Sequence, residues 1–463
     1  MQRKSEKMIK NKDFFEKMNE LHSFDVDMYL KSLQENPKKS IRINNIKVNG
    51  NIISHLPFNV VQNRVNQDLY YVDSEDKVGN TIEHHCGAFY VQEPAASMPV
   101  FAIKDSLPGA IVVDLCASPG GKTTQLAEYV GAEGLIISNE IVAKRVNVLR
   151  GNIERLGISN AVVTNNNVEQ LADILAGVAD VVVVDAPCSG EGMFRKDPDT
   201  VMEWSEGGVE ACASRQLYLL QNASRMLKND GIMIYSTCTF NRNENEMVVE
   251  QFLNTNPDFV VCDVPEAIKS VSRDGEAANN KIDLKKCRRF YPQDDFGEGQ
   301  FLCVMHKNGK GMALLSKNTK NKQMLLTKSE TDIVMKFLQE NFTISNCMLG
   351  KVGGQIFLMP QNMLDVSGLN IVACGVCVGE IRNGRLEPHH HLYMALGQFS
   401  RNKLDIQDER LAKKFIAGEQ LNNQAVADGY CAVLYNGITL GFGKSKGGVI
   451  NNRYPKGLRK ILQ

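Results

Sequence analysis

Two cysteines follow apolar stretches and adjoin polar turn residues. Cys188 lies in the run DAPCSG, which begins at Asp185 directly after the apolar residues 181–184. Cys238 lies in the run YSTCTF, at the end of the apolar residues 231–236. A single cysteine is more often a small buried hydrophobe than a functional thiol. Two cysteines in matching positions, with an acid beside the first, indicate instead a cleft that brings two thiols together.

A glycine turn precedes both cysteines in the chain, within VVDLCASPGGKTTQLAEYV at 112–130. The pattern predicts a buried strand ending at Asp114, a Pro-Gly-Gly turn at 119–121 and then a helix. Glycines let the backbone approach a ligand closely, and the first N–H groups of a helix favour a carboxylate or phosphate. Glu140 follows the next predicted strand, where an acid can accept both hydroxyls of a ribose. These features indicate a nucleoside cofactor and fit NAD or S-adenosylmethionine equally well. The alternative is a glycine turn with a purely structural role. The turn does not match the P-loop motif that binds the phosphates of ATP.

Strand and helix signals alternate from about residue 107 to residue 306. Such alternation predicts an open parallel sheet with helices on both faces, and ligands in these sheets bind at the carboxyl ends of the strands. The predicted strands are 111–115, 135–138, 162–164, 181–184 and 231–236, and the predicted helices are 122–130, a segment ending at 155, and 211–227.

The flanking segments have weaker signals. The first 95 residues predict short helices and one extended segment, and the Lys/Asn/Gly-rich residues 306–323 predict a linker. Beyond it we expect several strands, helices and a final hairpin with its turn at Asn436-Gly437. The expected elements are helices 14–21, 26–33, 330–341, 391–398 and 408–417, and the extended segment 40–48.

Composition and charge limit the class of protein. A chain of 463 residues predicts two to four domains at roughly 100–200 residues each. No apolar run reaches the roughly 18 residues of a membrane span, and no secretory signal is visible, so we expect a cytoplasmic protein with reduced cysteines. The 53 basic and 53 acidic residues cancel. Basic residues nevertheless gather in 1–12, 306–328 and 441–463, which is typical of basic patches on a neutral or acidic body.

The motifs resemble the Nol1/Nop2/Sun family of RNA (cytosine-C5)-methyltransferases, and within it the bacterial RsmF-type 16S rRNA enzymes. The resemblance rests on DLCASPGGK, DAPCSGEG and STCTF, supported by GMFRKDP, FYVQEPAASMP, Arg42-Ile43-Asn44, Glu244-Asn245-Glu246 and the ending LGFGKSKGGVINNRYPKGLR. It implies a Rossmann-like class I S-adenosylmethionine methyltransferase sheet of the α/β class, with an α+β N-terminal region and a C-terminal PUA-like RNA-binding domain. The implied domains are an N-terminal RNA-binding region 1–95, a catalytic domain 96–307, a basic linker 308–324, an intermediate domain 325–400 and a PUA-like domain 401–463.

The resemblance also implies roles for individual residues. Cytosine C5 is a weak nucleophile until a thiolate adds to C6, which is covalent catalysis by an activated cysteine. Cys238 would be that nucleophile, Cys188 would assist product release, and Asp185 would bind the cytosine at N3 and its amino group. The cofactor would be S-adenosyl-L-methionine, and no metal is implied. Its predicted contacts are Cys116, Ala117, Ser118, Pro119, Gly120, Gly121, Lys122, Glu140, Arg145, Asn167 and Asp185.

Two positions depart from the family pattern. Asn167 stands where relatives have an aspartate that contacts adenine, and an amide oxygen can still accept from the adenine amino group. Gln293 stands where relatives commonly have histidine.

The implied partner is rRNA of the 30S subunit. We expect the protein to be monomeric and not to bind a membrane. DNA is not expected, because DNA cytosine methyltransferases use the Pro-Cys thiol as nucleophile and need a Glu-Asn-Val motif that this chain lacks. The alternatives are a tRNA substrate and a non-catalytic RNA-binding assembly factor. We expect 441–463 to contact RNA, because Arg453-Tyr454-Pro455-Lys456 mixes an aromatic with cations.

Two further patterns are weaker signals. Cys374 and Cys377 form a lone CxxC, and a zinc site needs a second ligand pair. The three histidines at 389–391 follow Pro388 at a predicted helix start, where a structural role is favoured over metal binding.

Overall fold

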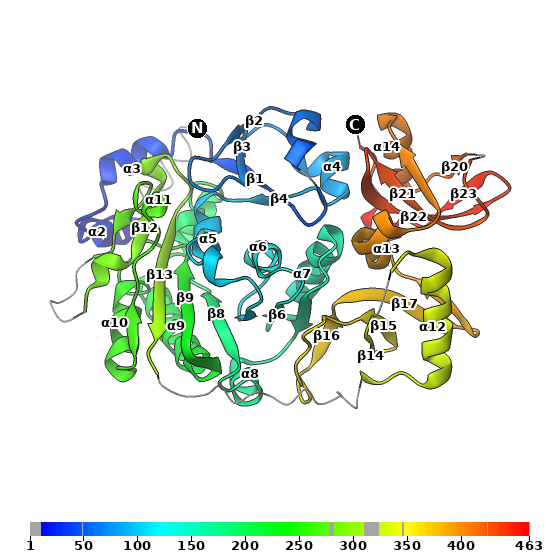
Figure 1. Cartoon of the computed structure of the whole chain (residues 1–463). Coiled ribbons are helices and arrows are strands. Elements are labelled where there is room, and N and C mark those ends of the chain that lie inside the picture. The colour runs from blue at the N-terminus through cyan, green and yellow to red at the C-terminus, as the bar shows by residue number, and fades with distance from the viewer. Residues whose placement is uncertain are drawn as a thin grey trace.

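The computed structural model describes residues 11–48, 50–276, 282–309, 324–344, 347–423 and 425–462. Within these residues the chain forms four β-sheets. Figure 1 shows the N-terminal sheet above the largest sheet. The two C-terminal sheets lie one above the other at the right of the picture. The basic segment 1–12 and the predicted linker lie almost wholly outside the described residues.

The largest sheet carries the glycine turn and both cysteine motifs. Its strand order is β11-β12-β13-β9-β8-β5-β6-β7-β16, with β10 paired to β13. The strands are β5 (Ile111–Asp114), β6 (Leu135–Asn139), β7 (Ala161–Thr164), β8 (Ala179–Asp185), β9 (Leu227–Thr237), β10 (Phe259–Val261), β11 (Arg273–Asp274), β12 (Arg288–Phe290), β13 (Gln300–Lys307) and β16 (Ile371–Cys374).

The predicted parallel order holds for the five central strands, and antiparallel strands extend the sheet at both edges. The strands β7, β6, β5, β8 and β9 are parallel, but β13 runs antiparallel to β9 and β16 runs antiparallel to β7. Strand β12 also pairs antiparallel with β13, because residues 291–299 join the two strands without a helical crossover. Strand β16 extends the sheet with residues beyond 307.

Helices cover both faces of this sheet, as predicted. Alternate residues of β5 enter opposite cores, Val112 with the helices α6 and α7, and Val113 with α8, α9 and α10. The strand ADVVVVD of β8 is apolar on both faces because both are covered. The helices are α5 (Met98–Phe101), α6 (Gly121–Val130), α7 (Ala143–Leu156), α8 (Val168–Ile174), α9 (Glu206–Met226), α10 (Glu246–Thr255) and α11 (Glu266–Lys269).

The chain reverses direction across the sheet between β5 and β8. From β5 it continues outward through β6 and β7, and it then returns to the other side of β5 as β8. Open α/β sheets bind ligands outside the carboxyl ends of the strands at such a switch point. The glycine turn follows β5, and the first cysteine motif follows β8, so both predicted sites lie at this point.

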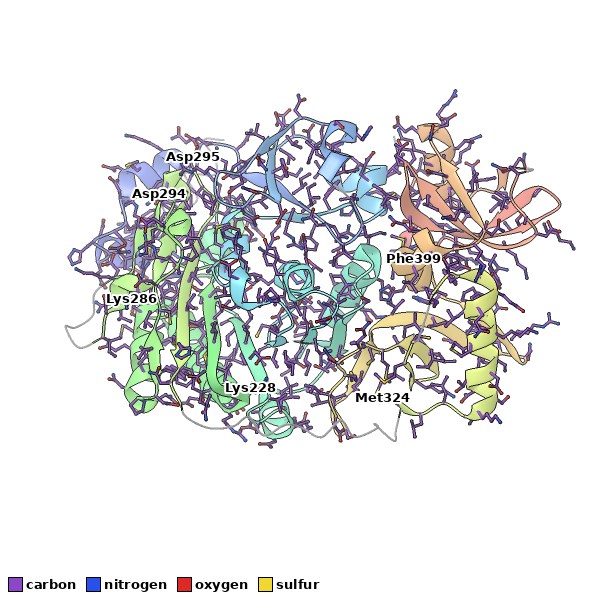
Figure 2. The ribbon with its side chains drawn as sticks, viewed as in Figure 1. Lys228, Lys286, Asp294, Asp295, Met324 and Phe399 are labelled. Carbon is purple, nitrogen blue, oxygen red and sulfur yellow. The ribbon has the colours of Figure 1, made fainter. Side chains whose placement is uncertain are left out.

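The N-terminal region packs against the same end of the sheet. Its four-stranded sheet has the order β2-β3-β1-β4, and the predicted extended segment 40–48 is a strand only as far as Ile43. Lys38 pairs with Asp295 at 2.6 Å, and Figure 2 shows Asp294 and Asp295 near the N-terminal helices. The elements are α2 (Lys12–Asn19), α3 (Val26–Ser32), β1 (Lys39–Ile43), β2 (Val60–Gln62), β3 (Leu69–Val72), α4 (Ile82–His85) and β4 (Phe89–Gln92).

The C-terminal half forms two smaller sheets, and the turn at Asn436-Gly437 joins β21 to β22 with positive φ at both residues, as predicted. Helix α12 begins with a capping box between Thr327 and Glu330. The elements are α12 (Lys328–Asn341), β14 (Leu349–Val352), β15 (Gln355–Leu358), β17 (Val376–Arg382), β18 (Arg385–Pro388), α13 (His390–Leu396), β19 (Lys403–Ile406), α14 (Glu409–Ala417), β20 (Leu421–Asn422), β21 (Gly429–Tyr435), β22 (Ile438–Lys446) and β23 (Val449–Asn452).

Tyr454 is buried within the C-terminal segment 441–463, for which the sequence predicted contact with RNA. The ring is 3% exposed and lies beside His390, and its hydroxyl lies 2.8 Å from Nδ1 of His85. A buried ring that joins the N-terminal region to the C-terminal sheet cannot offer its face to a base. The basic side chains around it, among them Arg453 and Lys456, remain outside this core.

The weaker signals have structural settings. Cys374 and Cys377 are buried in two strands that follow each other in the chain but belong to different sheets. The side chain of His389 accepts from a backbone N–H as the N-cap of α13. Among the described residues, no group of three or more His, Cys, Asp or Glu side chains could hold a metal ion. No helix in the described part of the chain has the length and apolarity needed to cross a membrane.

Candidate active site

The two predicted thiols meet at the carboxyl ends of β8 and β9. Sγ of Cys188 and Sγ of Cys238 lie 3.3 Å apart, and both side chains are half-buried. The loops that carry them run side by side, and the hydroxyls of Ser189 and Thr239, one from each loop, lie 2.8 Å apart. The convergence predicted from the sequence therefore occurs.

A glycine allows this close approach. The N–H of Gly192 donates to the carbonyl of Cys238 at 2.8 Å. A Cβ at position 192 would lie 2.9 Å from that same carbonyl oxygen and 3.1 Å from the carbonyl oxygen of Gly299. Any side chain here would push the loop of Cys188 away from that of Cys238, which explains the second glycine of SGEG.

The hydrogen bond with Cys238, together with burial, raises the pKa of the Cys188 thiol well above its usual value. Cys188 therefore stays protonated near neutral pH. A protonated thiol can donate to a neighbouring thiolate, so the arrangement suits one nucleophilic and one proton-carrying sulfur.

Asp185 ends β8 beside the thiols and holds three neighbours. Its Oδ2 lies 2.8 Å from Nζ of Lys122, and its Oδ1 accepts from Ser236 Oγ at 2.7 Å and from Gln300 Nε2 at 3.4 Å. Lys122 is 8% exposed, so its ammonium compensates the Asp185 carboxylate within the site. Sequence reasoning placed Lys122 with the cofactor and missed its pairing with Asp185, as well as both other partners.

Glu191 fixes the segment that follows Cys238. One carboxylate oxygen accepts from the N–H groups of Phe240 and Asn241 at 2.6 and 2.8 Å. The other accepts from Trp204 Nε1 at 2.8 Å and from Asn241 Nδ2 at 2.9 Å. Both oxygens of this fully buried side chain are thus satisfied, and the loop cannot shift without breaking charged hydrogen bonds.

The first two residues of the Glu-Asn-Glu triplet at 244–246 hold the cysteine loops through hydrogen bonds. Glu244 accepts from the Ser189 N–H at 3.0 Å and from Asn241 Nδ2 at 2.8 Å, so it joins the two cysteine loops. Asn245 donates to the Thr239 carbonyl at 3.0 Å.

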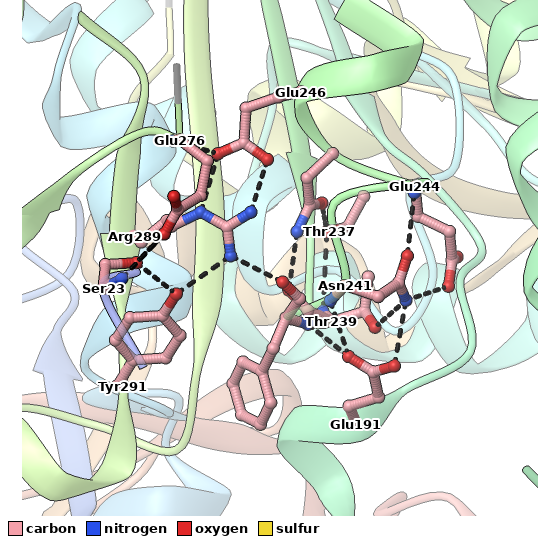
Figure 3. A network of polar contacts seen from close by, with 12 residues as sticks. Ser23, Glu191, Thr237, Thr239, Asn241, Glu244, Glu246, Glu276, Arg289 and Tyr291 are labelled. Atoms are coloured by element: carbon pink, nitrogen blue, oxygen red, sulfur yellow. Dashed lines mark hydrogen bonds and ion pairs between the residues drawn. The ribbon is translucent and has the colours of Figure 1, made fainter. Parts of the chain in front are cut away.

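The third member, Glu246, forms a buried ion pair with Arg289, whose Nε donates to Oε1 at 2.6 Å. Arg289 also donates to the Phe240 carbonyl at 2.5 Å and to the Tyr291 hydroxyl at 2.9 Å (Figure 3). The same tyrosine lies 3.0 Å from Ser23, which connects the N-terminal region to the Cys238 loop.

The cofactor loop is held from two sides. Ser118 precedes a cis proline, its Oγ donates to the Arg145 carbonyl at 3.0 Å, and Arg145 Nη2 returns a hydrogen bond to the Ser118 carbonyl at 2.7 Å. Gly120 is the N-cap residue of α6 and has a φ of 112°, a backbone conformation that residues with a side chain rarely adopt. From the N-terminal sheet, Arg42 donates to the Gly121 carbonyl at 2.9 Å.

Two buried carboxylate oxygens beside this loop have no hydrogen-bond partner. They are Oε2 of Glu140, which lies 3.2 Å from the Arg145 guanidinium, and Oδ1 of Asp114. Burial raises the pKa of Asp114 to about 7. Glu140 is 2% exposed, and its Oε1 accepts from the Val142 N–H at 2.9 Å. A buried carboxylate oxygen at the end of β6 that accepts no hydrogen bond fits a ribose hydroxyl, so the residues present fit a nucleoside cofactor.

The two positions that depart from the family differ in setting. Asn167 is exposed and accepts from the Gln170 N–H at 2.9 Å as the N-cap of α8. Its amide oxygen is therefore already used within the chain. Both polar atoms of the Gln293 side chain are buried without a hydrogen-bond partner.

The strand order with β13 antiparallel beside β9, and the loops at its switch point, define the class I S-adenosylmethionine methyltransferase fold predicted from sequence. A methyltransferase homologue from Pyrococcus horikoshii has this fold, with a TM-score of 0.56 and 24% identity over 66% of this chain and 99% of that one. The NSun6 structure from the same organism, determined with SFG, has a TM-score of 0.53 and 20% identity over 61% of this chain and 94% of that one.

Four family models match successive parts of the chain. Residues 11–94 match the N-terminal domain of 16S rRNA methyltransferase RsmF, and 103–306 match 16S rRNA methyltransferase RsmB/F. Residues 336–396 match the first C-terminal domain of RsmF, and 401–460 match the RsmF PUA domain.

Curated relatives agree over most of the chain. Ribosomal RNA small subunit methyltransferase F of Shewanella amazonensis is 30% identical over 85% of this chain and 84% of that protein. The Vibrio vulnificus protein of the same name is 29% identical over 96% of both. The chain belongs to this RsmF family, as the resemblance predicted, and it is an rRNA methyltransferase.

Proposed function

We propose that this enzyme methylates C5 of a cytosine in 16S rRNA, through a covalent bond between Cys238 and C6 of the base. The observation that carries the proposal is the 3.3 Å approach of the Cys188 and Cys238 thiols beside Asp185. A methyltransferase acting on a more nucleophilic atom has no need of two thiols at the reacting base.

S-adenosyl-L-methionine, when bound, supplies the methyl group. The loop 116–122 would hold its amino-acid end, Glu140 its ribose, and Arg145 would orient Glu140 through their 3.2 Å contact. Oε2 of Glu140 is buried and accepts no hydrogen bond within the chain, which supports a ribose at this point. An adenine contact by Asn167 would require its amide oxygen to serve both the base and the cap of α8.

The chain's own residues divide the work on the cytosine. Cys238 would add as a thiolate to C6, while Asp185, held by Lys122 and Ser236, would bind N3 and the exocyclic amino group. Elimination would then break the C6–S bond and remove the proton from C5. Cys188, kept protonated by its surroundings, would pass its proton to the departing Cys238 sulfur and accept the C5 proton in its place, which restores the C5–C6 double bond. The base must leave its stack or be unpaired to enter the site.

The remaining assignments belong to the same proposal. We infer rRNA within the 30S subunit as the substrate, a monomeric enzyme, and a cytoplasmic location. Relatives of the chain carry small-subunit rRNA methyltransferase names, which supports the choice of substrate. The division into an N-terminal RNA-binding region 1–95, a catalytic domain 96–307, a linker 308–324, an intermediate domain 325–400 and a PUA-like domain 401–463 remains a prediction.

Mapping of 5-methylcytosine in rRNA and tRNA after depletion of the protein tests the proposal. We expect one or more 16S rRNA sites to disappear and to return with wild type but not with Cys238→Ala. Loss of tRNA sites instead would favour the tRNA alternative. Unchanged maps would contradict methylation by this chain and favour a non-catalytic assembly factor.

A second experiment separates the two thiols. Cys188→Ala should accumulate a covalent RNA–protein adduct, because addition at C6 proceeds while release is slowed. Cys188→Ala/Cys238→Ala should form no adduct. Equal trapping by both variants, measured by denaturing gel electrophoresis, would show that the roles are assigned wrongly.

A further inference from the structure

We propose that Cys188 and Cys238 are also an oxidative modification site, at which a hydroperoxide converts the two thiols to a disulfide. The geometry points to this reaction. The sulfurs are 3.3 Å apart, and a disulfide needs about 2.0 Å, so small rotations of the two side chains suffice. Both side chains are half-buried, which leaves room for a small oxidant.

The surrounding backbone holds the two cysteines opposite each other. Ahead of them, the Ala186 N–H donates to the Ser236 carbonyl at 2.9 Å. Behind them, Ser189 and Thr239 are joined through their hydroxyls, and the Gly192 N–H donates to the Cys238 carbonyl. Contacts on both sides of the pair keep the loops together, so the bond can close without backbone movement over a long distance.

The chemistry proceeds in two steps. The Cys238 thiol gives up its proton and attacks the hydroperoxide, which breaks the O–O bond, releases an alcohol or water, and leaves a sulfenic acid on Cys238. The Cys188 sulfur then attacks this sulfenic sulfur, loses its own proton, and displaces water as the disulfide forms. The two thiols together lose two electrons and two protons, and the peroxide oxygens are reduced.

Cys238 is the sulfur that is oxidised first. The thiolate is the form that reacts with peroxides. Cys188 is held in its thiol form by the hydrogen bond to Cys238 and by burial, so it suits the role of the resolving cysteine. A nearby resolving thiol also protects Cys238 from irreversible oxidation beyond the sulfenic acid.

The chain contains a matched control pair. Cys287 and Cys303 stand opposite each other where β12 begins, because β12 pairs antiparallel with β13 and Arg288 is the partner of Leu302. Both side chains are fully buried between the helices and the main sheet. The two cysteines are close together in both pairs, but only the active-site pair is accessible to solvent. A comparison of the two pairs therefore tests whether access to solvent decides which thiols are oxidised.

The test treats the folded, reduced full-length enzyme with hydrogen peroxide, blocks the remaining thiols, and maps cross-linked peptides by mass spectrometry. We expect a peptide that links Cys188 to Cys238 and is two hydrogens lighter than its reduced parts. Dithiothreitol should restore both thiols. Peptides linking Cys287 to Cys303 should reach less than about a tenth of that yield while the fold persists by circular dichroism.

The variants make the result decisive. Cys188→Ser should carry oxygen adducts on Cys238 in place of the link, and Cys238→Ser should leave Cys188 largely unmodified. Oxygen adducts without a link in the wild-type protein, or equal linking of the buried pair, would overturn the proposal.

Loss of methyl transfer on oxidation rests on the proposed function and is measured separately. The link can therefore form even if the enzyme methylates another atom, and the failure of one proposal is distinguishable from failure of the other.

Discussion

The thiol side and the cofactor side of the site differ in how fully the chain satisfies its own polar groups. Beside the thiols, Glu191 accepts four hydrogen bonds, and the Arg289–Glu246 pair is buried with both charges matched. Beside the cofactor loop, Glu140 and Asp114 each leave one buried oxygen without a hydrogen-bond partner. A buried acceptor left unpaired costs about 1–3 kcal/mol.

This difference separates two tasks. The thiols must be placed accurately before the base arrives, and the four hydrogen bonds to Glu191 together with the Arg289–Glu246 pair do so without a ligand. The cofactor side gains its missing partners only on binding, so part of the binding free energy comes from oxygens that folding alone leaves unsatisfied. We therefore expect substitutions in the hydrogen-bonding network that supports the thiols to impair reaction and stability together, and those on the cofactor side to act mainly on affinity.

The largest expected effect is that of Cys238→Ala. Methyl transfer should fall by more than roughly 10³-fold, because removal of a covalent nucleophile leaves only binding and positioning. Stability should change little, because the loop is held through its backbone. Transfer of tritiated methyl groups to rRNA measures the loss. Cys212→Ala, at a half-buried thiol on α9, is the control and should retain activity.

Glu191→Gln breaks the network on the thiol side. The amide replaces one acceptor oxygen by a donor, so two of the four N–H groups lose their partner. We expect the free energy of unfolding to fall by about 3 kcal/mol, since hydrogen bonds to charged groups contribute about 1.5–3 kcal/mol each. The turnover number should fall more than the Michaelis constant for RNA rises. An unchanged turnover number in a destabilised variant would show that Glu191 supports folding only.

Asp114→Asn tests the partnerless oxygen near the cofactor loop through pH. Because burial raises the pKa of Asp114 to about 7, the folded state binds a proton that the unfolded state has released above its own lower pKa. Stability contributed by this group therefore decreases as the pH rises from about 4 to about 7, by about 2–3 kcal/mol between pH 5 and 8. The asparagine variant should lack this slope in its melting temperature. Asp105→Asn, at an exposed position, should keep it.

Glu140→Gln should act on cofactor affinity. A neutral amide is a weaker acceptor for ribose hydroxyls and loses the charge that Arg145 balances. We expect the dissociation constant for S-adenosylmethionine to rise about tenfold, or 1.4 kcal/mol. Isothermal titration calorimetry measures it, with Glu133→Gln as the exposed control. Unchanged affinity would contradict the ribose contact, and a stability loss as large as that of Glu191→Gln would contradict the contrast between the two sides.

The motifs made the chemistry predictable, whereas the supports of the site were mostly hidden. Cys188, Cys238 and Asp185 could be placed together because parallel strands end at one edge. Lys122 and Gln300 reach Asp185 from positions far apart in the chain, and no local pattern encodes that meeting. Tyr454 contacts His85 of the N-terminal region, which is far away in the chain, so its burial could not be read from the cations beside it in the sequence.

The smallest expected effect is at Asn167, where the family pattern predicts an adenine contact and the structure has a helix cap. Asn167→Ala should lower the free energy of unfolding by about 1 kcal/mol, because α8 loses its N-cap. Asn167→Asp should keep the cap and the stability, since aspartate caps as well as asparagine does. If the cap is the whole role, cofactor affinity in both variants should stay within about twofold of wild type, a change below 0.5 kcal/mol. A larger loss of affinity in Asn167→Ala, restored in Asn167→Asp, would place adenine at this residue and make the cofactor side more dependent on its ligand than the present hydrogen bonds indicate.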